Sequence, residues 1–204
     1  MKTLRWLSIC LIVILSGCIF DDGTYKVGET VPSLRTKTLD DVGGDLTRIT
    51  TFRYPDKRMY QHSLDDALLK NQVIVLAFAT PGHCTQCDKH LQMLKAALNK
   101  YEDDVLFLHM DQYQNPEAFK AFTVIGDPWT FVIDGNQTIR LKRAGRMLLR
   151  EVDIVLTGLI KENVAQLSQK NQLKDKSLQE GSLSADPLQQ NSALEKSSLE
   201  QKAG

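Results

Sequence analysis

The sequence lacks an excess of either charge and contains few cysteines. Its 204 residues include 25 Lys and Arg against 25 Asp and Glu, which gives a formal net charge of +0. This balance, with no run of Lys or Arg, argues against a nucleic-acid partner. The 4 cysteines include a single Cys-x-x-Cys pair, whereas structural zinc sites favour two such pairs. The length suffices for one domain with a core and additional segments.

A membrane-spanning run is missing at the N-terminus. Residues 4–15 are almost wholly apolar, but a spanning helix needs about 20 residues. Lys2 precedes this run and Arg5 is its second residue. Leu-Ser-Gly-Cys stands at the end of the run, at residues 15–18. This ending resembles the bacterial lipobox. The resemblance implies cleavage before Cys18 and lipidation of that cysteine, and two or three acyl chains anchor a protein stably. The alternative is an ordinary secretory signal with a cysteine at this place by chance.

We divide the chain into four segments. They are a signal peptide (residues 1–17), the lipidated cysteine with a polar tether (18–26), a folded domain (27–168) and a disordered or weakly helical polar tail (169–204). Gln, Ser and Lys dominate the tail, and its leucines fit neither a helix face nor a strand face. A lipid-anchored protein of this kind faces the periplasm or the cell exterior. Ile19 after the lipid cysteine favours the outer membrane in a Gram-negative envelope.

Two cysteines remain as thiols after export and lipidation. The first cysteine leaves with the signal peptide and Cys18 is consumed by lipid, so Cys84 and Cys87 are left. Outside the cytoplasm such a pair meets an oxidising or actively managed redox environment. Three interpretations are open at this point: a redox pair, a copper site completed by His83 or His90, and a plain structural disulfide.

The folded segment alternates strand and helix patterns. Residues 72–79 (QVIVLAFA) are a continuous β-branched and apolar run, typical of a central strand buried on both faces. Residues 34–62 lack a period and predict short strands and turns, with one turn at residues 43–44, before a helix capped by Ser63. The remaining expected elements are a helix over 88–100, a strand over 105–110, a helix starting at Asn115-Pro116, strands over 129–134 and 138–141, and a helix from 147 to about 167. This order predicts an α/β fold: a mixed sheet with a parallel core and an antiparallel edge hairpin, flanked by helices.

The cysteine pair lies between a buried strand and a helix. Cys84 therefore sits at or near a helix N-terminus, where the helix dipole and free N–H groups favour a thiolate over a thiol. The two-residue spacer brings Cys87 within reach of the first sulfur. Cys84 can then attack a substrate disulfide and Cys87 can resolve the mixed disulfide.

Three blocks of the sequence resemble the thioredoxin superfamily, in particular its membrane-tethered TlpA/ResA-like branch. They are VIVLAFATPGHCTQCDKHLQML around the cysteines, VIGDPWTFVIDG at residues 124–135, and the opening VGETVPSL. The resemblance implies a thioredoxin-like fold, a cis Pro128 beside the cysteine pair, and a backbone at Asp127 that pairs with an extended substrate segment. It also implies protein thiol or disulfide substrates, a redox partner protein and no cofactor.

The chain departs from this family at the residues next to the motif. His83 stands before the first cysteine where the family usually has Trp, and the loop holds one extra residue. The position of a buried acid in many members matches Ala77, and Asp127 replaces the usual Thr, Val or Ile before the cis-proline. A carboxylate at Asp127 disfavours the Cys84 thiolate, whereas an imidazolium at His83 favours it. We hypothesise that these two residues set the redox poise together.

The predicted function is an extracytoplasmic thiol:disulfide oxidoreductase that acts on envelope proteins. Cys84 and Cys87 are the predicted catalytic residues, while Pro128, Asp127 and His83 are predicted to contact substrate. The direction of electron flow stays open. One alternative is a thiol peroxidase, because TPGHC resembles the TPGC of some peroxiredoxins with a shift of one residue. The other is a copper-binding or assembly factor that uses the same fold.

Overall fold

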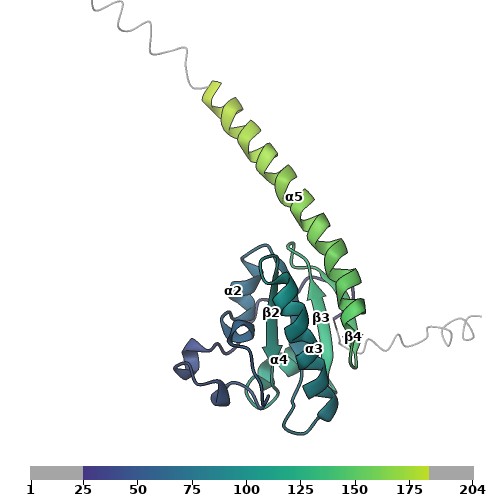
Figure 1. Cartoon of the computed structure of the whole chain (residues 1–204). Helices are drawn as coiled ribbons and strands as arrows, with labels where there is room; N and C mark the ends of the chain where they lie inside the picture. The colour runs from purple at the N-terminus through teal and green to yellow at the C-terminus, as the bar shows by residue number, and fades with distance from the viewer. Residues whose placement is uncertain (1–24, 184–204) are drawn as a thin grey trace, which may run out of the picture. The chain divides into compact units, whose positions relative to one another are not determined.

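The computed structural model describes residues 25–183, with side chains described up to residue 177. The chain divides into two compact units, Met1–Leu149 and Arg150–Gly204. The predicted signal peptide, the lipid-modified Cys18 and the last part of the predicted tail lie outside the described residues. Figure 1 labels helices α2 to α5 and strands β2 to β4.

A mixed four-stranded sheet forms the centre of the first unit, in the order β2-β1-β3-β4. The strands are β1 (Val73–Phe78), β2 (Val105–Met110), β3 (Trp129–Ile133) and β4 (Ile139–Ala144). Strand β1 pairs with β2 in parallel, through the crossover helix α3, and with β3 in antiparallel orientation. Strand β4 pairs antiparallel with β3 at the edge. The structure thus confirms the predicted parallel pair and antiparallel edge hairpin.

Strand β1 is buried along its whole length, as its apolar run predicts. Alternate residues of a strand point to opposite faces of a sheet. Ile74, Leu76 and Phe78 belong to one core cluster that also contains buried residues of α2 and α4. Phe78 lies at the centre of an aromatic group, with ring centroids 5.1 Å from Phe119 and 5.7 Å from Phe131. This packing fixes the end of β1 from which the cysteine loop departs.

The helices of the first unit are α2 (Leu64–Leu68), α3 (Thr85–Tyr101) and α4 (Pro116–Ala121). Ser63 caps α2 as predicted, since its side chain accepts a hydrogen bond from the Asp66 N–H. Pro116 occupies the first turn of α4, also as predicted. The Asn115 side chain does not cap this helix; its Oδ1 instead accepts a hydrogen bond from the Lys37 N–H at 3.0 Å. Asn115 thereby ties the N-terminal segment to the core.

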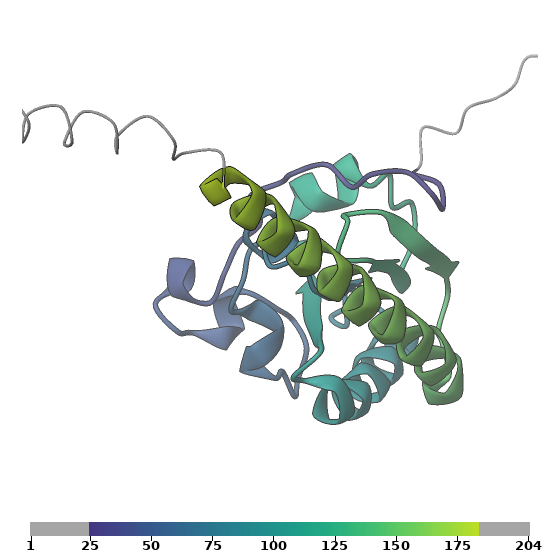
Figure 2. The ribbon, with the colours of Figure 1, turned by 90° about the horizontal axis from the view of Figure 1, so that it is seen from above.

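The prediction of short strands in residues 34–62 is wrong. The structure has three 3-10 helices there: η1 (Asp40–Val42), η2 (Leu46–Arg48) and η3 (Lys57–Tyr60). Side chains of Asp45 and Asp56 accept backbone hydrogen bonds at the starts of η2 and η3, and such local bonds compete with strand pairing. The predicted turn is present, with φ of 67° at Gly43 and 82° at Gly44. Figures 1 and 2 show this segment in blue beside the β2 edge, which η3 contacts.

The second unit is described by helix α5, Leu149–Leu183. The sequence predicts this helix only to about residue 167, and α5 continues past the predicted start of the polar tail. Gln, Lys and Leu, which are frequent in residues 166–178, have favourable helix propensities, and no proline occurs between residue 149 and Pro187. Within residues 25–183, no helix combines the length and apolar character that a membrane span requires.

Candidate active site

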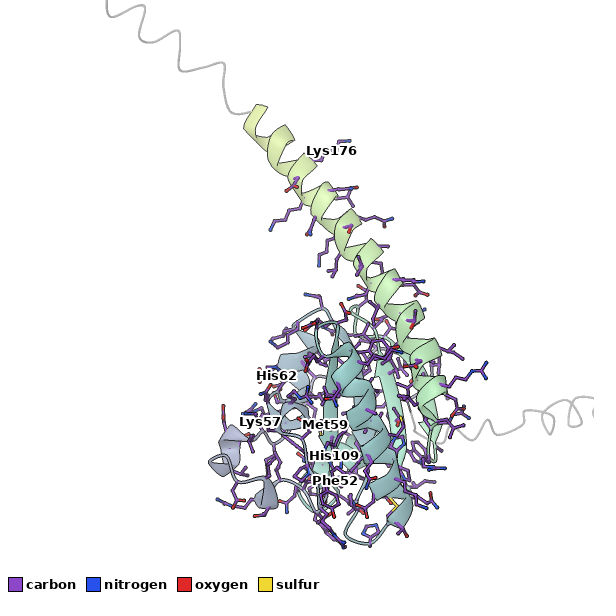
Figure 3. All side chains as sticks on the ribbon, in the orientation of Figure 1. Phe52, Lys57, Met59, His62, His109 and Lys176 are labelled. Carbon is purple, nitrogen blue, oxygen red and sulfur yellow. A yellow bond between two sulfur atoms is a disulfide. The ribbon has the colours of Figure 1, made fainter. Side chains whose placement is uncertain are left out.

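The two cysteines lie at the start of α3, where they form a disulfide. Cys84 is the N-cap residue of the helix, and the Cα atoms of Cys84 and Cys87 are 5.2 Å apart. The Cys87 N–H donates a hydrogen bond of 3.1 Å to Cys84 Sγ. Cys84 is half-buried whereas Cys87 is fully buried. Cys84 is therefore the sulfur that another molecule can reach. Figure 3 shows the disulfide as a yellow bond at the end of α3.

The position of Cys84 favours a thiolate once the disulfide is reduced. Helix α3 is 17 residues long, and the N-terminus of such a helix carries a partial positive charge. The Cys87 N–H already points at the Cys84 sulfur. Because a thiolate is a stronger acceptor than a thiol, both features stabilise the charged form.

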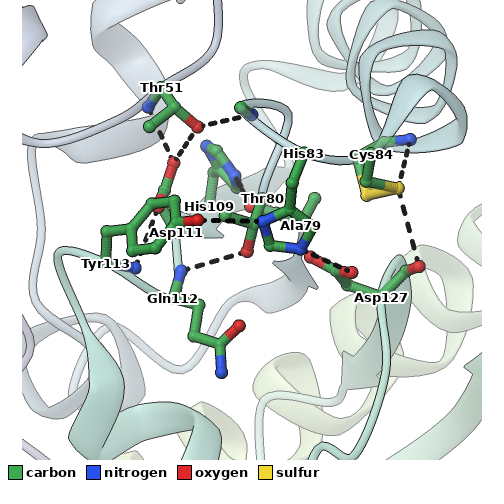
Figure 4. The surroundings of a disulfide bond; sticks show 12 residues. Thr51, Ala79, Thr80, His83, Cys84, His109, Asp111, Gln112, Tyr113 and Asp127 are labelled. Atoms are coloured by element: carbon green, nitrogen blue, oxygen red, sulfur yellow. Dashed lines mark hydrogen bonds and ion pairs between the residues drawn. A yellow bond between two sulfur atoms is a disulfide. The ribbon is translucent and has the colours of Figure 1, made fainter.

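The loop before Cys84 is held by hydrogen bonds from a distant segment (Figure 4). The Gly82 N–H donates to Thr51 Oγ1 at 2.9 Å. Thr51 donates to Asp111 Oδ2 from its backbone N–H at 2.7 Å and from its hydroxyl at 2.6 Å. Thr80 Oγ1 accepts from the Gln112 N–H at 3.3 Å. The cysteine loop is thus held in place by Thr51, which follows η2, and by Asp111 and Gln112, which follow β2.

A buried histidine, His109 of β2, lies behind this loop (Figures 3 and 4). Its Nε2 is 2.8 Å from the Ala79 carbonyl oxygen and its Nδ1 is 2.7 Å from the Tyr60 hydroxyl. Because a carbonyl only accepts, Nε2 carries the proton and Nδ1 accepts from Tyr60. Burial lowers the pKa of His109, which keeps the ring neutral. No sequence motif contains His109, and its only signal is a histidine inside the otherwise apolar run VLFLHM. In the sheet it pairs in register with Ala77.

His90 of α3 does not point to a metal site. Its Nδ1 accepts a hydrogen bond from the Met147 N–H at 3.3 Å, and its Nε2 is 2.8 Å from Thr130 Oγ1. Burial lowers the pKa of His90 to about 4. Both ring nitrogens are therefore engaged within the core, and the predicted copper alternative gains no ligand from His90.

The peptide bond between Asp127 and Pro128 is cis, as the family resemblance implies. Pro128 is buried, and the Asp127 carbonyl oxygen lies 3.7 Å from Cys84 Sγ. The backbone of Asp127 thus borders the reachable sulfur (Figure 4). The contact of Pro128 and Asp127 with substrate stays a prediction.

The side chains of Asp127 and His83 face each other next to the disulfide (Figure 4). The distance from His83 Nε2 to Asp127 Oδ1 is 3.7 Å, and the side chains are 45% and 12% exposed, respectively. His83 Nδ1 is 3.3 Å from the Tyr113 hydroxyl. Asp127 Oδ2 is buried and accepts no hydrogen bond from any described residue. The Asp127 carboxylate is therefore largely buried, and one of its oxygens has no hydrogen-bond donor among the described residues.

A hollow of about 170 Å³ opens beside these residues. Its lining includes the polar residues His83, Gln112 and Asp127 and the apolar residues Phe119, Val124 and Ile125. The Ile125 side chain is itself strongly exposed. The surface next to Cys84 thus offers both an apolar contact and a carboxylate to a bound chain.

Comparisons with known proteins show which family the central part of the chain resembles. Residues 56–150 match the family model described as Thioredoxin. The chain carries a thioredoxin-family domain. Its four-stranded mixed sheet with flanking helices is a thioredoxin-like fold. A search of curated proteins finds no match.

Solved structures similar to the thioredoxin-family domain include three thioredoxins. A Fasciola hepatica thioredoxin is 20% identical, with a TM-score of 0.42, over 47% of this chain and 90% of the other. Mitochondrial thioredoxin 3 from Saccharomyces cerevisiae, in its oxidised form, is 19% identical with a TM-score of 0.40 over 46% and 84%. A thioredoxin-2 described as a component of malaria parasite protein secretion machinery is 19% identical with a TM-score of 0.41 over 43% and 84%.

The thioredoxin-family domain and its cysteine pair together identify a chemistry. The matched residues 56–150 include Cys84 and Cys87, which are at disulfide distance. A thioredoxin domain with such a pair supports a thiol:disulfide oxidoreductase, in either direction of electron flow.

Proposed function

We propose that the protein is a lipid-anchored, extracytoplasmic thiol:disulfide oxidoreductase of the TlpA/ResA-like branch, acting on protein substrates of the cell envelope. The observation that carries this proposal is the half-buried Cys84 at the start of α3, bonded to the buried Cys87 beside the cis Asp127–Pro128 bond. The lipobox-like ending at residues 15–18 supports the anchor, and the remaining pair of cysteines suits a compartment outside the cytoplasm.

The chemistry follows from the unequal exposure of the two sulfurs. In the reducing direction, the Cys84 thiolate attacks one sulfur of a substrate disulfide and the other substrate sulfur leaves as a thiolate. The Cys87 thiolate then attacks Cys84 Sγ in the mixed disulfide, which releases the second substrate sulfur and forms the Cys84–Cys87 disulfide. Two electrons pass from the protein to the substrate. In the oxidising direction the same steps run in reverse.

Substrate binding is assigned to the surface around Cys84. The backbone of Asp127 borders the reactive sulfur and would pair with an extended segment of the substrate. Ile125 offers an exposed apolar contact nearby. His83 and Asp127 would lie against the residues that flank the substrate cysteine.

The reduction potential of the Cys84–Cys87 couple tests the proposal against the structural-disulfide alternative. The full-length protein would be equilibrated with thiol–disulfide buffers and its redox state read by alkylation and mass spectrometry. Structural disulfides have potentials below about −300 mV, whereas redox-active pairs range from about −270 mV for a reductant to about −120 mV for an oxidant. A reduction potential in the redox-active range supports the proposal and shows whether the protein acts as a reductant or an oxidant. A pair that stays oxidised in every such buffer contradicts it.

The lipid anchor needs a separate test. Cells producing the wild-type chain and a Cys18→Ser variant would be labelled with a radioactive fatty acid and fractionated. The proposal expects label and membrane association for the wild type, and loss of both for the variant. An unlabelled wild-type protein would overturn the anchor and leave the redox assignment intact.

The peroxidase alternative receives no support from the loop geometry. A peroxidase would use a threonine hydroxyl close to the reactive sulfur. Thr80 is fully buried, and its hydroxyl accepts a hydrogen bond from the Gln112 N–H. This threonine anchors the loop instead.

A further inference from the structure

We infer that the reduced form of this site binds a divalent, thiol-seeking cation of the zinc class through Cys84, Cys87 and Asp127. The two Sγ atoms and one Asp127 carboxylate oxygen all lie within 4.8 Å of one another. In a tetrahedral zinc site with Zn–S distances near 2.3 Å and Zn–O distances near 2.1 Å, neighbouring ligand atoms are about 3.5–3.8 Å apart. Once reduction frees the sulfurs to separate, small side-chain rotations reach this geometry.

The Asp127 carboxylate is the strongest sign of a missing positive partner. Its Oδ2 is buried without any hydrogen-bond donor among the described residues. Its Oδ1 is 3.7 Å from His83 Nε2, which exceeds the range of a hydrogen bond. Buried polar atoms are nearly always paired, so an unpaired carboxylate oxygen calls for an explanation. A bound cation would supply the partner that Asp127 Oδ2 lacks among residues 25–177.

The electrostatics of the reduced site suit a dication. Two thiolates and one carboxylate place three negative charges within a small volume, and zinc sites are built from cysteine sulfur, imidazole nitrogen and carboxylate oxygen. The Cys87 N–H donates to Cys84 Sγ, and hydrogen bonds of this kind orient metal ligands. Water or His83, whose Nε2 is 3.7 Å from Asp127 Oδ1, would supply the fourth ligand.

Binding is possible only after the disulfide is opened. A phosphine or dithiol reductant delivers two electrons, and two protons convert the disulfide into two thiols. The cation then replaces both thiol protons, which pass to the buffer, and the carboxylate binds as a third ligand. The bound ion covers the Cys84 sulfur that would otherwise attack a substrate disulfide. Metal binding would therefore compete with the redox cycle and protect the dithiol from oxidation.

The test is a metal titration of the full-length protein. The protein would be reduced anaerobically with a phosphine and titrated with Zn²⁺ against a chromophoric chelator, and with Co²⁺ as an optical probe of thiolate ligation. We expect one equivalent to bind to the reduced wild type and none to the disulfide form. Asp127→Asn should bind at least about 10-fold more weakly. Asp104→Asn removes one negative charge from an exposed position after α3, and should bind like the wild type.

Two results would overturn the inference: equal uptake by the reduced and disulfide forms, or equal affinity in Asp127→Asn and the wild type. Circular dichroism would show whether Asp127→Asn folds. If it does not, X-ray absorption of the zinc-loaded wild type decides between the outcomes. Two sulfur and additional oxygen or nitrogen ligands support the inference, whereas a shell without two sulfurs or without any oxygen or nitrogen contradicts it.

Discussion

Replacing Asp127 with Asn should make the Cys84 thiolate more stable in the reduced, metal-free protein. A carboxylate oxygen of Asp127 lies within 4.8 Å of Cys84 Sγ. Two unit charges about 4 Å apart interact by about 1 kcal/mol in water and about 4 kcal/mol at an effective dielectric constant of 20. Because both side chains are partly exposed, solvent screening places the repulsion at the lower end of this range, about 1–2 kcal/mol. The thiolate-to-thiol ratio of Cys84 should therefore rise roughly 5- to 30-fold at a given pH.

The assay is the ultraviolet absorbance of the thiolate, followed across pH together with the rate of alkylation of Cys84. A chelator keeps the sample metal-free, so that the cation proposed above does not contribute. Asp104→Asn is the matched control, since it removes the same charge from an exposed position after α3. An unchanged thiolate titration in Asp127→Asn, or the same change in Asp104→Asn, would show that the Asp127 carboxylate does not act on Cys84.

Three further predictions concern the surroundings of the cysteine pair. Gly82→Ala would bring a Cβ to 3.2 Å from the Thr51 side chain, which hydrogen bonds to Asp111 and Gly82 hold in place, so urea unfolding should show a loss of about 1 kcal/mol; an unchanged midpoint would mean that the loop adjusts freely. His83→Ala should lower the thiolate fraction of Cys84, because it removes the ring nitrogen that lies 3.7 Å from the Asp127 carboxylate; an unchanged fraction would exclude a role of this side chain. Burial lowers the pKa of His90 to about 4. As pH falls below about 6.5, the unfolded chain therefore binds a proton at this residue and the folded protein does not. The stability of the wild type should drop by about 3 kcal/mol between pH 7 and 4 relative to His90→Gln, and parallel pH profiles of the two proteins would contradict this.

The elements that position the site follow from local patterns in the sequence. The continuous apolar run gives β1, the spacing of apolar residues gives α3, and together they place Cys84 at a helix N-terminus. The placement of Pro128 came from the family resemblance rather than from any property of the residue itself. These features depend on short stretches of chain, which is why the sequence sufficed.

The features that the sequence did not reveal depend on contacts between distant segments. His109 acquires its role from Tyr60 and the Ala79 carbonyl, which lie in other parts of the chain. Side-chain caps at Asp45 and Asp56 turned expected strands into 3-10 helices. The unpaired Asp127 oxygen is visible only once its surroundings are packed.

Trapping of a mixed disulfide tests most directly whether Cys84 and Cys87 act as an attacking and a resolving cysteine. A reduced Cys87→Ser variant would be mixed with a disulfide-containing protein and resolved on a non-reducing gel. The exposure of Cys84 and the burial of Cys87 predict a stable covalent adduct through Cys84 in this variant, and little or none with Cys84→Ser. Equal adducts in the two variants, or none in either, would contradict the proposed roles.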